Sequence, residues 1–204
     1  MRLFFTYGLF PVWFSSSLVV AYLAHERGVG PSEVIATITV VTAMVVAVIE
    51  RAHPAHQSWL RSHDDVTTDA IHVVVSQAAI PALVAGGIHA LTLQIAGAVP
   101  GATEGGLWPH EWPVVAQVGL ALVATQFPEY WWHRLSHTHP LLWRLHATHH
   151  SAERLYFLNA GRVPPLDTAF SSAIALGTLA LLGAGEQTML LLGVWVAVHG
   201  LFQH

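Results

Sequence analysis

Six long apolar stretches, separated by more polar segments of unequal length, divide the chain. They cover residues 3–24, 32–49, 69–99, 113–132, 166–185 and 187–202. An α-helix needs about 20 mainly apolar residues to cross the hydrocarbon core of a bilayer, and each stretch is close to that length or longer. The pattern therefore predicts an all-α fold, namely a polytopic helical membrane protein. The first stretch, which follows Arg2 and ends near small residues, has a signal peptide as its alternative interpretation.

The third stretch is long enough to be interpreted in two ways. It contains Pro81, Gly86 and Gly87, so it is either one crossing with a kink near Pro81 or a hairpin of two short helices. The arginines distinguish these alternatives, because positive residues collect on the cytoplasmic side of a membrane. If the stretch crosses the membrane once, seven arginines lie on one side and Arg27 alone lies on the other. If it is a hairpin, three arginines lie on one side and five on the other. One crossing is therefore predicted, with both chain ends and residues 133–165 in the cytoplasm.

Composition supports lipid as the surroundings of this chain. Hydrophobic residues make up 53% of it and charged residues 10%, with a mean hydropathy of +0.52; soluble domains carry about 25% charged residues. The net charge of −4 argues against a nucleic-acid partner, which requires a basic surface. There is no cysteine, and this excludes disulfides, thiolate metal sites and thiol nucleophiles.

The most polar part of the chain is the linker at residues 50–69. We interpret it as a solvated connector at the level of the lipid headgroups. Its acidic and hydroxyl residues, Asp64, Asp65 and Thr67 or Thr68, are candidates to cap the next helix. The linker histidines, His53, His56 and His63, have no strong ligand at helical spacing and are left out of any site.

Histidine is the unusual residue type here. The chain has 15 histidines, and six of them fall within residues 133–150. His133 and His137 are four apart and share one face of a helix. A second group follows as H-x-x-H-H, formed by His146, His149 and His150, and Pro140 between the groups is placed to begin a new helix after a break. His139 lies on neither of the helix faces that carry these two groups.

Five imidazoles from two adjacent helix ends are thus predicted to meet in a small volume. They cannot all be protonated there at neutral pH, because like charges repel and burial disfavours the cation. Neutral imidazole is a common metal ligand, so the pattern favours a metal site over a chance cluster. Nitrogen ligation without cysteine also suits oxidative chemistry, which would damage a nearby thiolate.

These residues carry a family resemblance. "EYWWHRLSH" followed by "LLWRLHATHHS" resembles the fatty acid hydroxylase/sterol desaturase superfamily of membrane histidine-box di-iron oxygenases. "IERAHP", "DAIH", "LWPHEWP" and "LNAGRVPPLD" match less specifically. The resemblance implies a transmembrane region over residues 1–44 and a hydroxylase-like domain over residues 45–204. It also implies a cytosolic histidine-rich cap holding two non-haem iron ions (zinc being possible in isolated protein), a lipid substrate and an external electron donor.

The chain departs from the family pattern in three places. A third box is expected beyond the last helix, but the sequence stops at His204, which matches a histidine that precedes that box; His199 is a weaker candidate. Pro164 stands where relatives often have histidine. Gln126 stands where an acidic residue is common, and Glu129, four residues before His133, is the candidate outer partner of that ring. The expected ligands are thus His133, His137, His146, His149, His150 and His204, in an enzyme that is incomplete at its C-terminus or in an inactive relative.

The neighbours of the boxes have two interpretations each. Tyr130, Trp131, Trp132 and Trp143 fit an interfacial aromatic belt or direct contact with substrate. Arg134 and Arg144 fit membrane anchoring, attraction of lipid phosphates, or ion pairs with Glu129 and Glu153. The resemblance places Asn159 and Arg162 in a loop that covers the site.

The leading functional hypothesis is an O₂-dependent oxidoreductase that hydroxylates or desaturates a sterol, fatty acyl chain or other lipid, in a bacterial inner membrane. A divalent-ion transporter is less favoured, because its ligands belong near the bilayer midplane. An inactive relative that binds metal or lipid without turnover remains an alternative. A zinc hydrolase is disfavoured because the chain has no H-E-x-x-H motif.

Overall fold

A computed structural model describes residues 7–98 and 106–203, and every regular element in these residues is helical. The α-helices are α1 (Leu9–Glu26), α2 (Pro31–Ala52), α3 (Val66–His72), α4 (Ile80–Ala98), α5 (Val114–Thr138), α6 (Pro140–His146), α7 (Pro165–Leu182) and α8 (Glu186–Gln203). The other helical elements are the π-helix η3 (Val73–Ala79) and the 3₁₀ turns η2 (Gln57–Leu60), η4 (Ala147–His150) and η5 (Asn159–Gly161). All six predicted apolar stretches contain a helix, which confirms the predicted all-α fold class.

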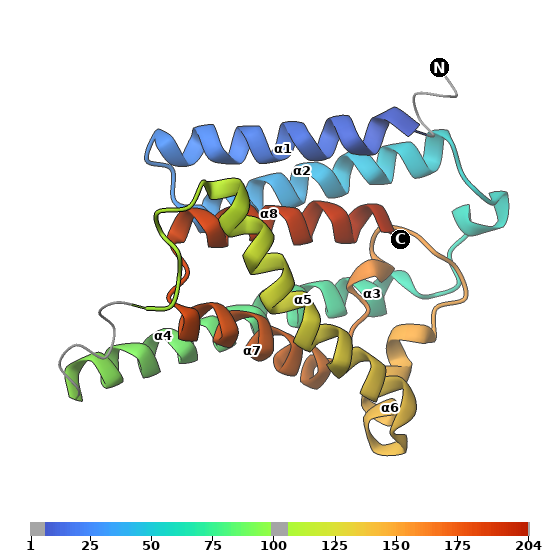
Figure 1. The fold of residues 1–204 in the computed structure, drawn as a ribbon. Coiled ribbons are helices and arrows are strands. Elements are labelled where there is room, and N and C mark those ends of the chain that lie inside the picture. The colour runs from blue at the N-terminus through green and yellow to red at the C-terminus, as the bar shows by residue number, and fades with distance from the viewer. Residues whose placement is uncertain (1–6, 99–105, 204) are drawn as a thin grey trace.

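The long helices form two layers that α5 crosses. In Figure 1, α1, α2 and α8 lie side by side in the upper layer, while α4 and α7 form the lower one. Helix α5 runs diagonally across both layers and packs against α7 and α8. Its C-terminal end leads into α6 at the lower right of the view. The predicted domain boundary at residue 45 falls inside α2 and stays a prediction.

The third apolar stretch is one helical run and not a hairpin. Helix α3, the π-helix η3 and α4 follow one another without interruption, and Pro81 is the second residue of α4. A proline has no N–H and crowds the carbonyl four residues before it, which here belongs to Gln77 inside η3. The wider π turn accommodates this crowding. The prediction of a single segment is confirmed, and the irregularity precedes Pro81.

Among residues 7–98 and 106–203, three helical segments are long and apolar enough to cross a membrane: α2, the run Val66–Ile95, and α7. They coincide with three of the six predicted crossings. In the most apolar window of Val66–Ile95 only 6% of the residues are buried in the protein. An apolar surface of this size is costly in water, so these exposed faces fit contact with lipid. Six crossings and their orientation remain a prediction.

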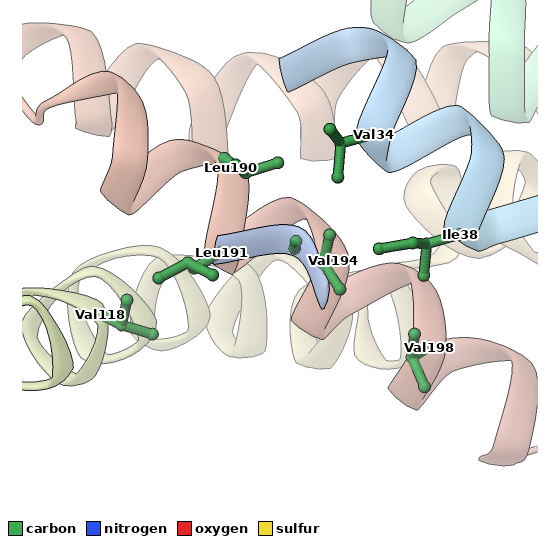
Figure 2. Close-up of a cluster of buried hydrophobic side chains, with 8 residues drawn as sticks. Val34, Ile38, Val118, Leu190, Leu191, Val194 and Val198 are labelled. Atoms are coloured by element: carbon green, nitrogen blue, oxygen red, sulfur yellow. The ribbon is translucent and has the colours of Figure 1, made fainter. Parts of the chain in front are cut away.

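Helix α8 is at the centre of the main core. Figure 2 shows Leu190, Leu191, Val194 and Val198 of this helix meeting Val118 of α5. Val34 and Ile38 of α2 complete the labelled cluster. The spacing of three and four residues along α8 places its buried side chains on adjoining faces of the helix. This core packs α8 against the first turns of α5, whereas the end of α5 that carries the first histidine pair packs against α7, where Trp132 donates to Asp167.

A group of hydrogen bonds around Gln117 holds the N-terminal end of α5. The Trp108 indole and the Thr188 hydroxyl both donate to the side-chain oxygen of Gln117, at 2.8 and 3.1 Å. The amide nitrogen of Gln117 donates to the carbonyls of His110 and Trp112. The "LWPHEWP" segment is therefore tied to α5 and α8 by one buried glutamine.

Candidate metal centre

Four histidine side chains converge where α5 ends and α6 and η4 turn back. They are His133 and His137 on the last turns of α5, His146 at the end of α6 and His150 in η4. Helix α5 continues past its predicted apolar stretch to Thr138, and α6 begins at Pro140 as predicted. One potential ligand atom from each ring lies within 4.8 Å of the others. His146 is buried and the other three rings are exposed.

The ring nitrogens within each box are at a spacing that suits coordination. The Nε2 atoms of His133 and His137 are 3.1 Å apart, and so are those of His146 and His150. Two nitrogens about 2.1 Å from one metal ion, at a right angle, are about 3.0 Å apart. Across the boxes, the ring centroids of His133 and His146 are 4.7 Å apart, as are those of His137 and His150.

Electrostatics favour neutral rings in this cluster. Burial and the neighbouring His146 ring lower the pKa of His133 below its ordinary value, and His137 lowers it further. The pKa of His150 is lowered by burial and by the same two rings. A neutral ring offers a lone pair, so the lowered pKa of His133 and of His150 favours the form of these two rings that binds metal.

Asp167 lies directly behind the cluster. Its carboxylate oxygens accept hydrogen bonds from His146 Nδ1 at 2.6 Å and from Trp132 Nε1 at 2.8 Å, and the side chain is 5% exposed. Because Nδ1 donates to Asp167, Nε2 of a neutral His146 carries its lone pair toward the other rings. Carboxylate–histidine–metal arrangements orient ligands in this way. Sequence analysis missed this role, although Asp167 stands in the first turn of α7 within the "LNAGRVPPLD" match.

The remaining box residue, His149, lies beside the cluster and not within it. Its ring centroid is 5.0 Å from that of His150 and 5.4 Å from that of His146. Its Nδ1 is 3.2 Å from the carbonyl oxygen of Arg162. A second ring is held in the same manner: His72 Nδ1 is 3.0 Å from the carbonyl oxygen of Val163. Sequence analysis did not assign His72, whose only signal was its spacing of three from Asp69 on one helix face.

The structure describes two of the three other histidines considered above, His199 and His139. His204 is outside the described residues. His199 packs against Phe10, with ring centroids 6.0 Å apart. His139 sits between α5 and α6 and is not part of the cluster, as predicted.

The expected partners on α5 are arranged differently from the sequence interpretation. The side chain that hydrogen-bonds to Glu129 is the amide of Gln126. Arg134 donates to the Tyr130 hydroxyl at 3.0 Å and lies over the Trp131 ring. Tyr130 and Trp131 are exposed, which fits an interfacial belt.

The other two aromatics of the predicted belt face the site. Trp132 turns inward to Asp167 and packs on Phe170, with ring centroids 4.8 Å apart. Trp143 stacks on His150 at 5.8 Å between centroids and contacts His137. Trp132 therefore contacts the carboxylate behind the cluster, while Trp143, which is itself exposed, packs against the histidine rings.

The linker at residues 50–69 is more than the solvated connector that we predicted. Asp65 is at the N-cap of α3 but makes no side-chain cap; its carboxylate binds the Arg154 guanidinium at 2.6 and 2.9 Å. The Arg154 guanidinium lowers the pKa of Asp65 to about 2. The exposed Glu153 pairs with His63 at 3.1 Å. Buried charges on the linker thus bind the segment that follows the second box.

Asn159 and Arg162, which the resemblance assigned to a covering loop, are buried supports of that loop. The Arg162 guanidinium binds the carboxylate of Asp69, which is fully buried in α3. The Asn159 amide donates to the Arg154 carbonyl and accepts from the Tyr156 N–H. Both side chains point to their supports, and it is the Arg162 backbone carbonyl that faces a box histidine.

A cavity of about 210 Å³ adjoins this side of the histidines. It is lined by His149, His150, Ala152, Leu155 and Asn159. The four clustered nitrogens and the carboxylate behind His146 fit a divalent transition-metal ion. Fold and site together define a helical protein with bilayer-length segments and, at one end, a histidine cluster that could hold a metal ion.

Comparison with protein families finds a match in the C-terminal part of the chain. The fatty acid hydroxylase family matches residues 118–204, which include most of α5, the helices α6 to α8 and all four clustered histidines. It is also similar to the ornithine lipid hydroxylase OlsE of Rhizobium tropici, with 34% identity over 164 residues that cover 80% of this chain and 50% of the relative. The chain thus spans about half the length of that relative. No solved structure matches it.

Proposed function

We propose that this protein acts in a membrane as an O₂-dependent, non-haem di-iron lipid hydroxylase. The observation that carries the proposal is the convergence of four histidine nitrogens within 4.8 Å, with Asp167 bound to the buried ring. The family match over the same residues supports hydroxylation as the reaction class. Bound iron would supply activation of O₂: one oxygen atom enters a C–H bond, and the other leaves as water with two electrons and two protons from an external donor.

In this proposal, His133, His137, His146 and His150 hold one ion. His149 lies beside them and His204 matches the family pattern, so these two are assigned to the second ion. Asp167 keeps the Nδ1 proton on His146, which leaves Nε2 for the metal. Trp132 holds Asp167 in place, and Trp143 packs on His150 and His137 and so helps to fix the orientation of these rings.

An aminolipid of the ornithine-lipid type is the substrate that we would test first. The support is the relative named ornithine lipid hydroxylase. The site also lies at the end of α5, where apolar aromatic side chains such as Phe127 and Trp131 are exposed and a lipid can approach from the bilayer. A desaturation product or a sterol substrate would be detected in the same assay.

The test measures metal and product on the same preparation. The chain is purified in detergent without air, its iron is counted, and it is given ornithine lipid, O₂ and a chemical reductant, with products followed by mass spectrometry. We expect bound iron and a lipid that has gained one oxygen atom. His146→Ala should lose both, whereas His56→Ala, whose ring packs on Trp59 outside the cluster, should lose neither.

Two results would contradict the proposal in different ways. Unchanged iron in His146→Ala would show that the cluster is not the metal site. Iron lost on that substitution, but no oxidised lipid from the unsubstituted protein, would instead indicate a relative that binds metal without turnover.

A further inference from the structure

Two buried charges meet immediately behind the second histidine box. The Asp69 carboxylate is fully buried near the start of an apolar, bilayer-length helical run, and it binds the Arg162 guanidinium. The Tyr156 hydroxyl also donates to this carboxylate, at 2.7 Å. Burying an ion pair costs more desolvation energy than a well-packed apolar pair would, and ionisable groups in membrane helices are most often functional. The pair therefore requires an explanation beyond stability.

The segment that Asp69 holds is the one that orients two histidine rings. Arg162 and Val163 are consecutive, and their carbonyl oxygens bind His149 Nδ1 and His72 Nδ1. A carbonyl only accepts hydrogen bonds, so in each neutral ring the proton is on Nδ1 and the lone pair is on Nε2. Both rings are thus set in the tautomer that binds metal through Nε2.

The position of these carbonyls depends on close packing as well as on charge. A β-carbon on Gly161 would lie 2.7 Å from Val73 Cγ2, so the loop lies directly against η3. The opposite end of the segment is held separately, by Arg154 on Asp65 and by Arg154 donating to the Trp59 carbonyl at 2.8 Å. Two ion pairs, Arg154 with Asp65 and Arg162 with Asp69, therefore hold this loop. Of these two, the pair with Asp69 involves the residue, Arg162, whose carbonyl oxygen faces His149.

We propose that Asp69 is a positioning residue of the metal centre, acting through Arg162 on the orientation and tautomer of His149 and His72. This inference rests on the proposed function, because it assumes that His149 binds metal. Loss of such outer partners commonly weakens metal affinity by about 10–100-fold.

The experiment uses the full chain loaded with Co²⁺, whose visible spectrum reports ligand number and geometry. We expect Asp69→Asn to weaken Co²⁺ binding by about tenfold or more, measured by competition with a chelator, and to change the spectrum. Asp65→Asn removes the matched carboxylate at the other end of the loop and should leave the spectrum unchanged. Arg162→Lys keeps the buried charges balanced and should reproduce the spectral change if Asp69→Asn does not fold.

A double-mutant cycle separates positioning from a general loss of structure. If Asp69 acts through His149, adding Asp69→Asn to His149→Ala should weaken Co²⁺ binding no further. Fully additive effects, or wild-type spectra for both Asp69→Asn and Arg162→Lys, would overturn the inference. His146→Ala distinguishes the two proposals: if it still binds Co²⁺ normally, the metal centre itself is wrong, and if it does not, only the role of Asp69 is in question.

Discussion

At the scale of single residues, the site depends on which nitrogen of each histidine ring carries the proton and which offers the lone pair. Asp167 fixes His146 from behind, and the carbonyls of Arg162 and Val163 fix His149 and His72. The grouping of His133, His137, His146 and His150 was predictable because spacings of three and four residues place histidines on one helix face. Their partners were not predictable, because Asp167 is 21 residues from His146 in sequence and meets it only after α7 packs against α5.

Asp167→Asn tests this residue-scale interpretation. The substituted amide would present an N–H or an oxygen to His146 Nδ1 but no negative charge, so the ring loses the partner that favours metal ligation. We expect metal affinity to fall by about 10–100-fold with the fold retained, measured by chelator competition alongside thermal unfolding. Asp64→Asn, on an exposed linker residue, is the control and should leave affinity unchanged. Equal affinities for the two variants would show that Asp167 does not act on the ligand.

At the scale of elements, the decisive contact is between the loop before α7 and the π-helix η3. The two approach each other so closely at Gly161 that there is no room for a side chain. Pro81 is a clear sequence signal for the irregular turn that precedes it. The contact of the loop with η3 has no such signal, because Gly161 and Val73 are far apart along the chain. The same holds for Asp65 and Asp69, which we interpreted as part of a polar linker and which the fold turns into ion-pair partners.

Gly161→Ala should therefore destabilise the protein. The new methyl group would overlap Val73 Cγ2, and overpacking of this kind costs about 1–3 kcal/mol. The thermal unfolding temperature in detergent should fall, and adding Val73→Ala should restore part of the loss. Gly119→Ala in α5 is the matched control, because no atom lies within 4 Å of the added carbon and helix propensity improves. An unfolding temperature that is unchanged in Gly161→Ala would contradict the close contact.

At the scale of the whole molecule, the two helical layers bring to one end the elements that build the site. The end of α5, the short helices α3 and α6, the start of α7, and the turns η4 and η5 contribute residues there. The exposed apolar faces of α4 and its neighbours fit lipid contact around this arrangement. The arginine pattern predicts that the site end is cytoplasmic, and this orientation can be measured directly because the chain has no cysteine.

Single introduced cysteines should report that orientation. Ser151, beside the second box, and Val29, in the turn between α1 and α2, are both exposed. In intact cells, a membrane-impermeant maleimide should label Val29→Cys and leave Ser151→Cys unlabelled, while both should react after the cells are opened. The reverse pattern in intact cells would invert the predicted topology.

The sequence by itself determined the helical class, the six apolar segments and the grouping of His133, His137, His146 and His150, although it also placed His149 with them; the single crossing over residues 69–98 followed from the distribution of arginines along the chain. Helix periodicity, segment length and histidine spacing are local features that need no knowledge of tertiary contacts. The tertiary structure alone decided that Asp167 binds His146, that Asp69 holds Arg162, and that His72 joins the same loop as His149. Those contacts join residues from 13 to 93 positions apart. Only the packing of α3, α5 and α7 against one another brings such groups within hydrogen-bonding distance, and no local pattern encodes it.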